Sequence, residues 1–145
     1  MKNIQHSLKY VLFAAAVLLA SCTTFAPSYN EQAYTNATSL KAKSLAMIEK
    51  SGTPYSRNAS DVETLLVEID AAFEFSKGLP NNTQSAKQWD LMRAKNGGLF
   101  GQYVELWKSQ GTVGSDARQF SKKGISDAYD QIICLEINKQ NLTKC

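Results

Sequence analysis

From residue 29 onward, apolar residues recur three or four positions apart, and this spacing restricts the chain to helices. A half-buried strand would need apolar and polar residues in strict alternation, and little alternation occurs here. Polar residues fill the intervening positions, so each expected helix has one face for a core and one for solvent. The sequence therefore predicts an all-α fold.

Four helical segments are expected, over residues 29–50, 60–78 and 83–110 and from Ser115 to about residue 135. The connecting segments are rich in Gly and Pro, which end helices. The apolar faces of the segments comprise, in order, Ala33, Ala37, Leu40, Leu45 and Ile48; Val62, Leu65, Leu66, Ile69, Ala72 and Phe73; Trp89, Met92, Leu99, Phe100, Tyr103, Leu106 and Trp107; and Ala117, Phe120, Ile125, Ala128, Ile132 and Leu135.

Capping residues set the expected helix boundaries. Ser60 and Glu63 have the spacing of a capping box, which places the start of the second helix at Ser60. Gly78, two residues before Pro80, is expected to end that helix. Ser115 is expected to cap the fourth helix.

Gly97-Gly98 interrupts the third segment. The pair costs about 2 kcal/mol in a helix interior relative to two alanines. It marks a kink, a break into two helices, or a place where another backbone comes close. A phosphate-binding loop is disfavoured, because no Lys-Ser/Thr follows the glycines and no strand precedes them.

Helices of about 20 to 28 residues joined by short loops favour antiparallel neighbours. The sequence thus predicts an up-and-down bundle of about four helices over residues 29–145.

The start of the chain is typical of an export signal. Lys2 and Lys9 precede an uncharged apolar run over residues 10–20. This run is much shorter than the ~20 residues that a spanning helix needs. A short buried helix is the alternative, but Pro27 would break it and no acidic residue precedes Glu31. Residues 1–21 are therefore interpreted as a signal peptide.

The run ends in Leu19-Ala20-Ser21-Cys22, which resembles the lipobox of bacterial lipoproteins in all four positions. The resemblance covers only the export segment. It implies cleavage after Ser21, a thioether-linked diacylglycerol on Cys22 and acylation of the new amino terminus. Acyl chains contribute about 0.8 kcal/mol per buried CH₂, so three of them would hold the protein on a membrane almost permanently.

Residue 23 bears on the destination of the lipoprotein. In the lipoprotein family an Asp after the lipidated cysteine commonly retains the protein in the inner membrane, and this chain has Thr23. In a bacterium with two membranes, the resemblance favours the periplasmic face of the outer membrane. Residues 22–28 would form a short tether with a reach of at most ~20 Å.

Cys134 and Cys145 remain after Cys22 is assigned to lipid, and in an oxidising envelope they are expected to form a disulfide. In a continuous helix their Cα atoms would lie ~16 Å apart, whereas a disulfide needs less than ~7 Å. The last helix must therefore end before Cys145, and Asn141, which tolerates a left-handed conformation, is a suitable place for the reversal. Free thiols or an intermolecular bridge remain the alternatives.

Cleavage leaves 124 residues with 14 basic and 13 acidic side chains, and it removes His6, the single histidine. The mature chain therefore cannot use Ser-His-Asp or Cys-His catalysis, or histidine ligands for zinc or haem. The charge gives no reason to expect nucleic acid. No catalytic residue, metal ligand or cofactor-binding residue is predicted.

Two sets of side chains could form a binding site. The aromatic set could line a ligand groove, although aromatics at helical spacing more often form a core; the acidic set could bind a cation or a basic partner, although a solvated helix face is commoner. No spacing singles out two of the carboxylates as a catalytic pair. The aromatic set is Trp89, Phe100, Tyr103 and Trp107, and the acidic set is Glu63, Glu68, Asp70 and Glu74.

The leading functional hypothesis is a non-enzymatic envelope lipoprotein, held in the outer membrane by the lipid on Cys22 and contacting a protein partner in the envelope. An inhibitor, immunity or phage-exclusion lipoprotein is the alternative. A carboxylate-dependent enzyme acting on cell-wall polymers is a third hypothesis, and it requires two acidic side chains facing one cleft.

Overall fold

The computed structural model describes residues 28–145, and this part of the chain is all-helical with no strand. The predicted fold class is confirmed. The elements in chain order are α2 (Glu31–Lys50), η1 (Tyr55–Arg57), α3 (Ala59–Gly78), α4 (Thr83–Arg93), α5 (Phe100–Gln110), α6 (Ser115–Ile137) and η2 (Leu142–Lys144), where η marks a single 3₁₀ turn.

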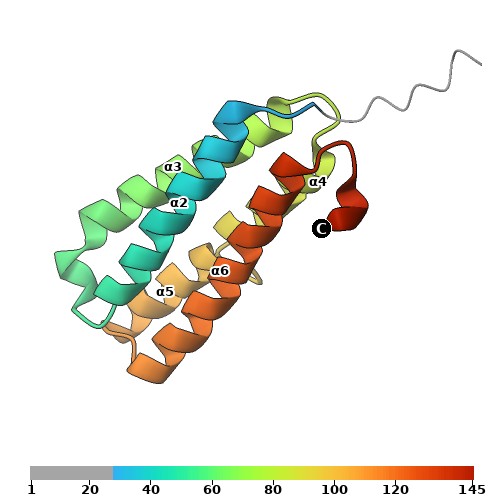
Figure 1. The fold of residues 1–145 in the computed structure, drawn as a ribbon. Coiled ribbons are helices and arrows are strands. Elements are labelled where there is room, and N and C mark those ends of the chain that lie inside the picture. The colour runs from blue at the N-terminus through green and yellow to red at the C-terminus, as the bar shows by residue number, and fades with distance from the viewer. Residues whose placement is uncertain (1–27) are drawn as a thin grey trace, which may run out of the picture.

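The helices form an up-and-down bundle (Figure 1). α2 packs between α3 and α6, and α4 closes the bundle by packing on α3 and α6. α5 follows α4 along the same side of the bundle, and it contacts η1 and the end of α4. The third helix, which was expected over residues 83–110, is therefore two helices, α4 and α5.

Polar contacts fix the antiparallel alignment of α2 with α6. Lys41 of α2 lies 2.6 Å from Asp130 of α6, and Glu49, two turns further along α2, pairs with Lys122, which lies two turns earlier on α6. Between these two pairs, the hydroxyls of Ser44 and Tyr129 hydrogen-bond at 2.8 Å inside the bundle. The N-terminus of α2 is consequently level with the C-terminus of α6.

One continuous core runs through the bundle. The predicted apolar faces of the first three segments supply most of it, with Leu45, Leu66, Phe73 and Leu99 partly buried at its edge. The buried core residues are Ala37, Leu40, Met47, Ile48, Val62, Leu65, Ile69, Ala72, Trp89, Met92, Phe100, Tyr103, Val104, Trp107, Val113, Ile125, Tyr129 and Ile132.

Two predicted caps are wrong, the first by two residues and the second by one. α3 begins at Ala59, with Asn58 in the N-cap position, so Ser60 lies inside the helix. The Asn58 amide donates hydrogen bonds to Thr53 Oγ1 and Pro54 O, which orders the preceding turn instead of capping the helix. Ser115 is the first residue of α6 and Gly114 is its N-cap.

Gly97-Gly98 lies in a tight loop between α4 and α5, so the helix breaks and does not merely kink. Gly97 has φ +67°, in the left-handed region that favours glycine. The loop folds back on α4, because the amide of Leu99 donates to Leu91 O at 2.9 Å. A Cβ at Gly98 would lie 2.1 Å from Ala94 O. Gly97 thus permits the break between the helices, and Gly98 permits the close approach of the loop backbone to Ala94.

The predicted apolar face of the fourth helix is wrong in its first two turns. Ala117 is exposed, and Phe120 is 84% exposed. The buried positions of α6 begin at Ile125, and counting back from it by three or four residues reaches Ser121 and Lys122 instead of Phe120.

The disulfide between Cys134 and Cys145 is confirmed, with Cα atoms 5.8 Å apart. α6 ends at Ile137, and a turn with Asn141 N donating to Asn138 O at 2.7 Å reverses the tail. The predicted left-handed conformation does not occur at Asn141, because Asn81 is the one non-glycine residue with positive φ between residues 28 and 145. None of the helices between these residues has the length and apolarity needed to cross a bilayer.

Replacing Cys134 and Cys145 together with serine is expected to lower the free energy of unfolding by roughly 2.5 to 3 kcal/mol. The side chains of Asn141, Thr143 and Lys144 are exposed, so the effect arises mainly from the lost constraint on the unfolded chain. Urea denaturation measures it, with Lys144→Ala as a control that should change stability by less than about 0.5 kcal/mol. A wild-type mass that does not rise by about 2 Da on reduction would contradict the bridge.

Candidate functional site

A groove of about 320 Å³ opens between α5 and the first half of α6. We call it the α5–α6 groove. Apolar side chains form most of its wall, and two glycines deepen it. The residues that define it here are Leu99 and Leu106 on the α5 side, Phe120 and Ile125 on α6, and Gly98 and Gly124.

α5 packs on η1 and α4, and residues 115–120 in the first turns of α6 are mostly exposed. Phe120 projects beside it, and Leu106 is partly exposed across from it. A Cβ added at Gly124 would meet no atom within 4 Å, so the groove is open at that point. The result is an exposed aromatic side chain beside an apolar hollow, an arrangement typical of interaction sites.

None of the described residues that line the α5–α6 groove is charged. Gln102, Ser121 and Tyr103 are its polar members, and the Tyr103 hydroxyl is hydrogen-bonded to Ser51. Burial raises the pKa of Tyr103, so its hydroxyl is neutral at physiological pH. The groove therefore offers apolar contact and neutral hydrogen-bonding groups.

The cations nearest Phe120 along α6 already have partners, and Arg118 donates to Val113 O at 2.7 Å. Lys122 hydrogen-bonds to Glu49 of α2, which lowers the pKa of that carboxyl. Lys123 pairs with Asp127 one turn later. Phe120 and the apolar walls are therefore the groove's main means of attracting a partner.

No family model, curated protein or solved structure matches the chain.

The aromatic residues proposed as a ligand groove lie in the core instead. Trp89, Phe100 and Trp107 are fully buried, and Tyr103, also buried, is the one of the four that lines the α5–α6 groove. The indole of Trp107 donates to Thr53 O at 3.1 Å, which ties α5 to the turn after α2. The core interpretation is correct for these side chains.

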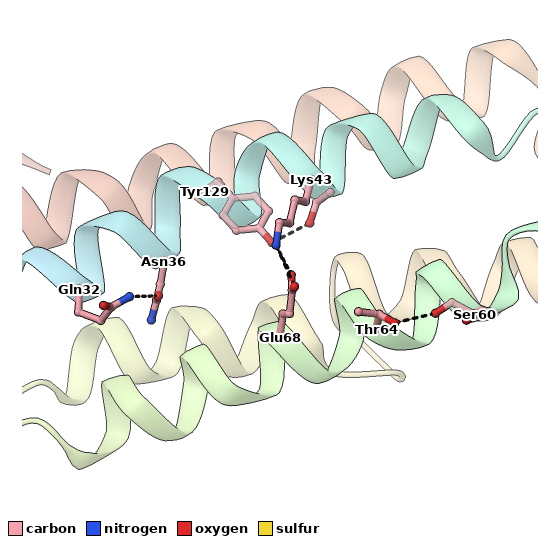
Figure 2. A network of polar contacts seen from close by, with 8 residues as sticks. Gln32, Asn36, Lys43, Ser60, Thr64, Glu68 and Tyr129 are labelled. Atoms are coloured by element: carbon pink, nitrogen blue, oxygen red, sulfur yellow. Dashed lines mark hydrogen bonds and ion pairs between the residues drawn. The ribbon is translucent and has the colours of Figure 1, made fainter.

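The acidic residues on α3 lie on a solvated face. Glu68 pairs with Lys43 of α2 at 2.7 Å (Figure 2), and Asp70 pairs with Arg93 of α4 at 3.2 Å. Glu63 and Glu74 are exposed. Within residues 28–145, no group of three His, Cys, Asp or Glu side chains is arranged to hold a metal ion.

One hollow between α2 and α3 contains two carboxylates, Asp61 and Glu68. They lie seven residues apart on one helix, which separates their Cα atoms by ~10 Å along its axis. Each pairs with a lysine of α2, Asp61 with Lys50 and Glu68 with Lys43. Glycosidase carboxyl groups lie ~5 to 9.5 Å apart with room for substrate between them, so this hollow gives the enzyme hypothesis little support.

A second, more polar hollow of about 520 Å³ lies further along the same α2–α3 seam. Figure 2 shows two of its polar side chains, Gln32 and Asn36, turned toward each other, and they hydrogen-bond at 2.7 Å. Lys43 and Glu68 close its other end. These polar groups are already paired with one another, so this hollow is a weaker candidate for a binding site than the α5–α6 groove.

A buried ion pair near the end of α6 was not predicted from the sequence. Glu136 and Lys139 are 0% and 3% exposed, and Lys139 Nζ lies 2.8 Å from Glu136 Oε2. Lys139 also donates to Asn82, whose amide donates to Ser76 Oγ at 2.8 Å. The group joins the ends of α3 and α6 to the start of α4. The helical spacing could have indicated that Glu136 is buried, because Glu136 lies four residues after the core residue Ile132.

Cys22, the predicted lipidation site, lies outside the described residues, as do the signal peptide and most of the tether. Lipidation of Cys22 remains a prediction.

Proposed function

We propose that this chain is a lipoprotein anchored to the periplasmic face of the outer membrane, and that it acts as a non-enzymatic interaction module. Its α5–α6 groove binds an apolar segment of a protein partner in the envelope. The observation that carries the interaction role is Phe120, 84% exposed beside a groove with no charged lining residue.

Two features support export and anchoring. The segment Leu19-Ala20-Ser21-Cys22 matches the lipobox in every position. The bridge between Cys134 and Cys145 suits an oxidising compartment such as the periplasm, because disulfides are rare in the cytosol.

The chemistry of the groove supports binding over catalysis. Removing apolar surface from water favours association, and aromatic anchors in pockets contribute much of the binding energy at protein interfaces. Acid–base catalysis needs a positioned group that titrates near the working pH, and the lining residues of this groove supply none.

Replacing Cys22 with serine is expected to prevent lipidation and to change the membrane distribution of the protein. The wild-type chain should begin at Cys22, carry the mass of three acyl chains and a glycerol, and fractionate with the outer membrane. Thr23→Asp should still be lipidated and should shift to the inner membrane. Intact-mass measurement and sucrose-gradient fractionation test both variants. A wild-type protein with no added lipid mass would refute the anchor.

Photo-crosslinking in cells tests the interaction role. A benzoylphenylalanine at position 120 is expected to give a crosslinked envelope protein, whereas the same probe at Val67, exposed on α3, is not. Identical adduct patterns at both positions, or no adduct at 120, would contradict the groove as the binding site. An adduct that forms only with an incoming enzyme or phage component would instead support the inhibitor or immunity hypothesis.

A further inference from the structure

Three segments meet at the end of the bundle where α2 begins (Figure 1). They are the start of α2, the turn between α3 and α4, and the end of α6 with its disulfide-bonded tail. The pairs Lys41–Asp130 and Glu49–Lys122 set the alignment of α2 and α6, so Tyr34 is level with Ile137. We call residues 28–34, 79–82 and 137–145 the tether end.

The tether end exposes large apolar side chains. Tyr29 and Ile137 are each 55% exposed, and the Tyr29 ring lies 6.4 Å from that of Tyr34. Pro80 is exposed in the turn between α3 and α4. At the opposite end of the bundle, the loops at residues 51–54 and 111–114 expose no large hydrophobic side chain.

Few exposed charges at the tether end are unpaired. Glu31 and Lys144 are exposed, have opposite signs and form no ion pair within residues 28–145. Lys139 is buried against Glu136. The tether end is thus close to neutral, and exposed tyrosine and aliphatic side chains suit the boundary between lipid and water.

The length of chain that precedes the bundle brings this end to the membrane. Cys22 and Ser28 can be at most ~20 Å apart, since each residue extends the chain by about 3.3 Å. α6 alone, with 23 residues, is ~34 Å long. A bundle anchored through Cys22 therefore has its tether end within reach of the lipid. When its long axis is normal to the membrane, its opposite end lies beyond the tether's length.

We infer that the tether end rests on the membrane surface, with Tyr29 and Ile137 entering the interfacial layer of the lipid. This inference depends on the proposed lipid at Cys22. It also orients the binding site, because Phe120 lies 17 residues before Ile137 on α6, about 25 Å along the helix axis. The α5–α6 groove then lies away from the membrane surface, where a partner in the periplasm can reach it.

Quenching by brominated lipids tests the orientation. The full lipidated protein is reconstituted into phosphatidylethanolamine–phosphatidylglycerol vesicles with brominated acyl chains, after intact-mass measurement has verified the lipid. Tryptophan reporters are introduced as Ile137→Trp and, as the matched control on the same helix, Phe120→Trp. The background from the buried residues Trp89 and Trp107 is subtracted with the wild-type protein.

The expected result is at least threefold more quenching of the reporter at position 137 than of that at 120. Adding Tyr29→Ser to the first variant should reduce the quenching at 137, while circular dichroism shows unchanged helix content. Equal quenching at both positions, or none at 137, would overturn the inference while leaving the lipid anchor intact. A chain without lipid on Cys22 refutes the proposed function, and this inference with it.

Discussion

Replacing Lys139 with methionine is expected to lower the free energy of unfolding by about 3 to 5 kcal/mol, because it leaves a buried carboxylate without its counter-charge. Glu136 is fully buried, and Lys139 Nζ is its charge partner at 2.8 Å. Within residues 28–145, no other group hydrogen-bonds to either oxygen of that carboxylate. The variant would bury the charge alone, or open this end of the bundle to hydrate it.

The loss of stability should be greatest where the end of α3, the start of α4 and the end of α6 meet. Lys139 donates to Asn82 at the start of α4, and the Asn82 amide donates to Ser76 O at 3.0 Å at the end of α3. Losing the ammonium group therefore also leaves the buried Asn82 carbonyl without its donor. Amide hydrogen exchange should accelerate first around residues 76–82 and 134–139.

A double variant separates the ion pair from simple loss of packing. Glu136→Met with Lys139→Met removes both charges and should recover much of the loss, because an apolar pair of similar volume often replaces a buried ion pair at little cost. Lys123→Met is the control, since Lys123 and Asp127 form an exposed pair one turn apart, worth less than about 1 kcal/mol. Urea denaturation followed by circular dichroism gives all four values. A Lys139→Met protein within 1 kcal/mol of wild type would show that the pair does not stabilise the fold.

Local sequence signals accounted for most of the fold. Apolar spacing and helix-breaking residues predicted α2, α3 and α6 to within a few residues, because both act within one or two helical turns. The bridge between Cys134 and Cys145 was predicted from the oxidising compartment that the lipobox resemblance implies, and it is present in the structure. The capping box at Ser60 failed because Asn58, two residues earlier, takes the N-cap position.

The candidate site could not be predicted in the same way. The α5–α6 groove depends on where α5 lies after the break at Gly97-Gly98, and that position is set by contacts with η1 and α4. Phe120 was assigned to the core because it is apolar, although its spacing from Ile125 is five residues. The ion pair was missed because charged residues were assigned to solvent, whereas Glu136 keeps the spacing of the core.

Replacing Gly101 with alanine is expected to destabilise the protein by about 3 kcal/mol, at the upper end of the cost of overpacking. A Cβ at Gly101 would lie 2.1 Å from Arg93 O and 2.7 Å from Ala94 O. Both atoms belong to the backbone at the end of α4, so no side-chain rotation can relieve the clash. α5 would have to move away from α4, and the α5–α6 groove would change shape with it. Loss of the crosslink from position 120 should therefore accompany the loss of stability.

Gly124→Ala provides the matched control, because it makes the same substitution in a helix that borders the same groove. A Cβ there meets no atom within 4 Å, and alanine is favoured over glycine in a helix by roughly 0.5 to 1 kcal/mol. The control should therefore raise the free energy of unfolding by about that amount. Opposite signs for the two alanines would show that close backbone contact between α4 and α5 stabilises the fold. A Gly101→Ala protein as stable as Gly124→Ala would show that the two helices are not held in contact there.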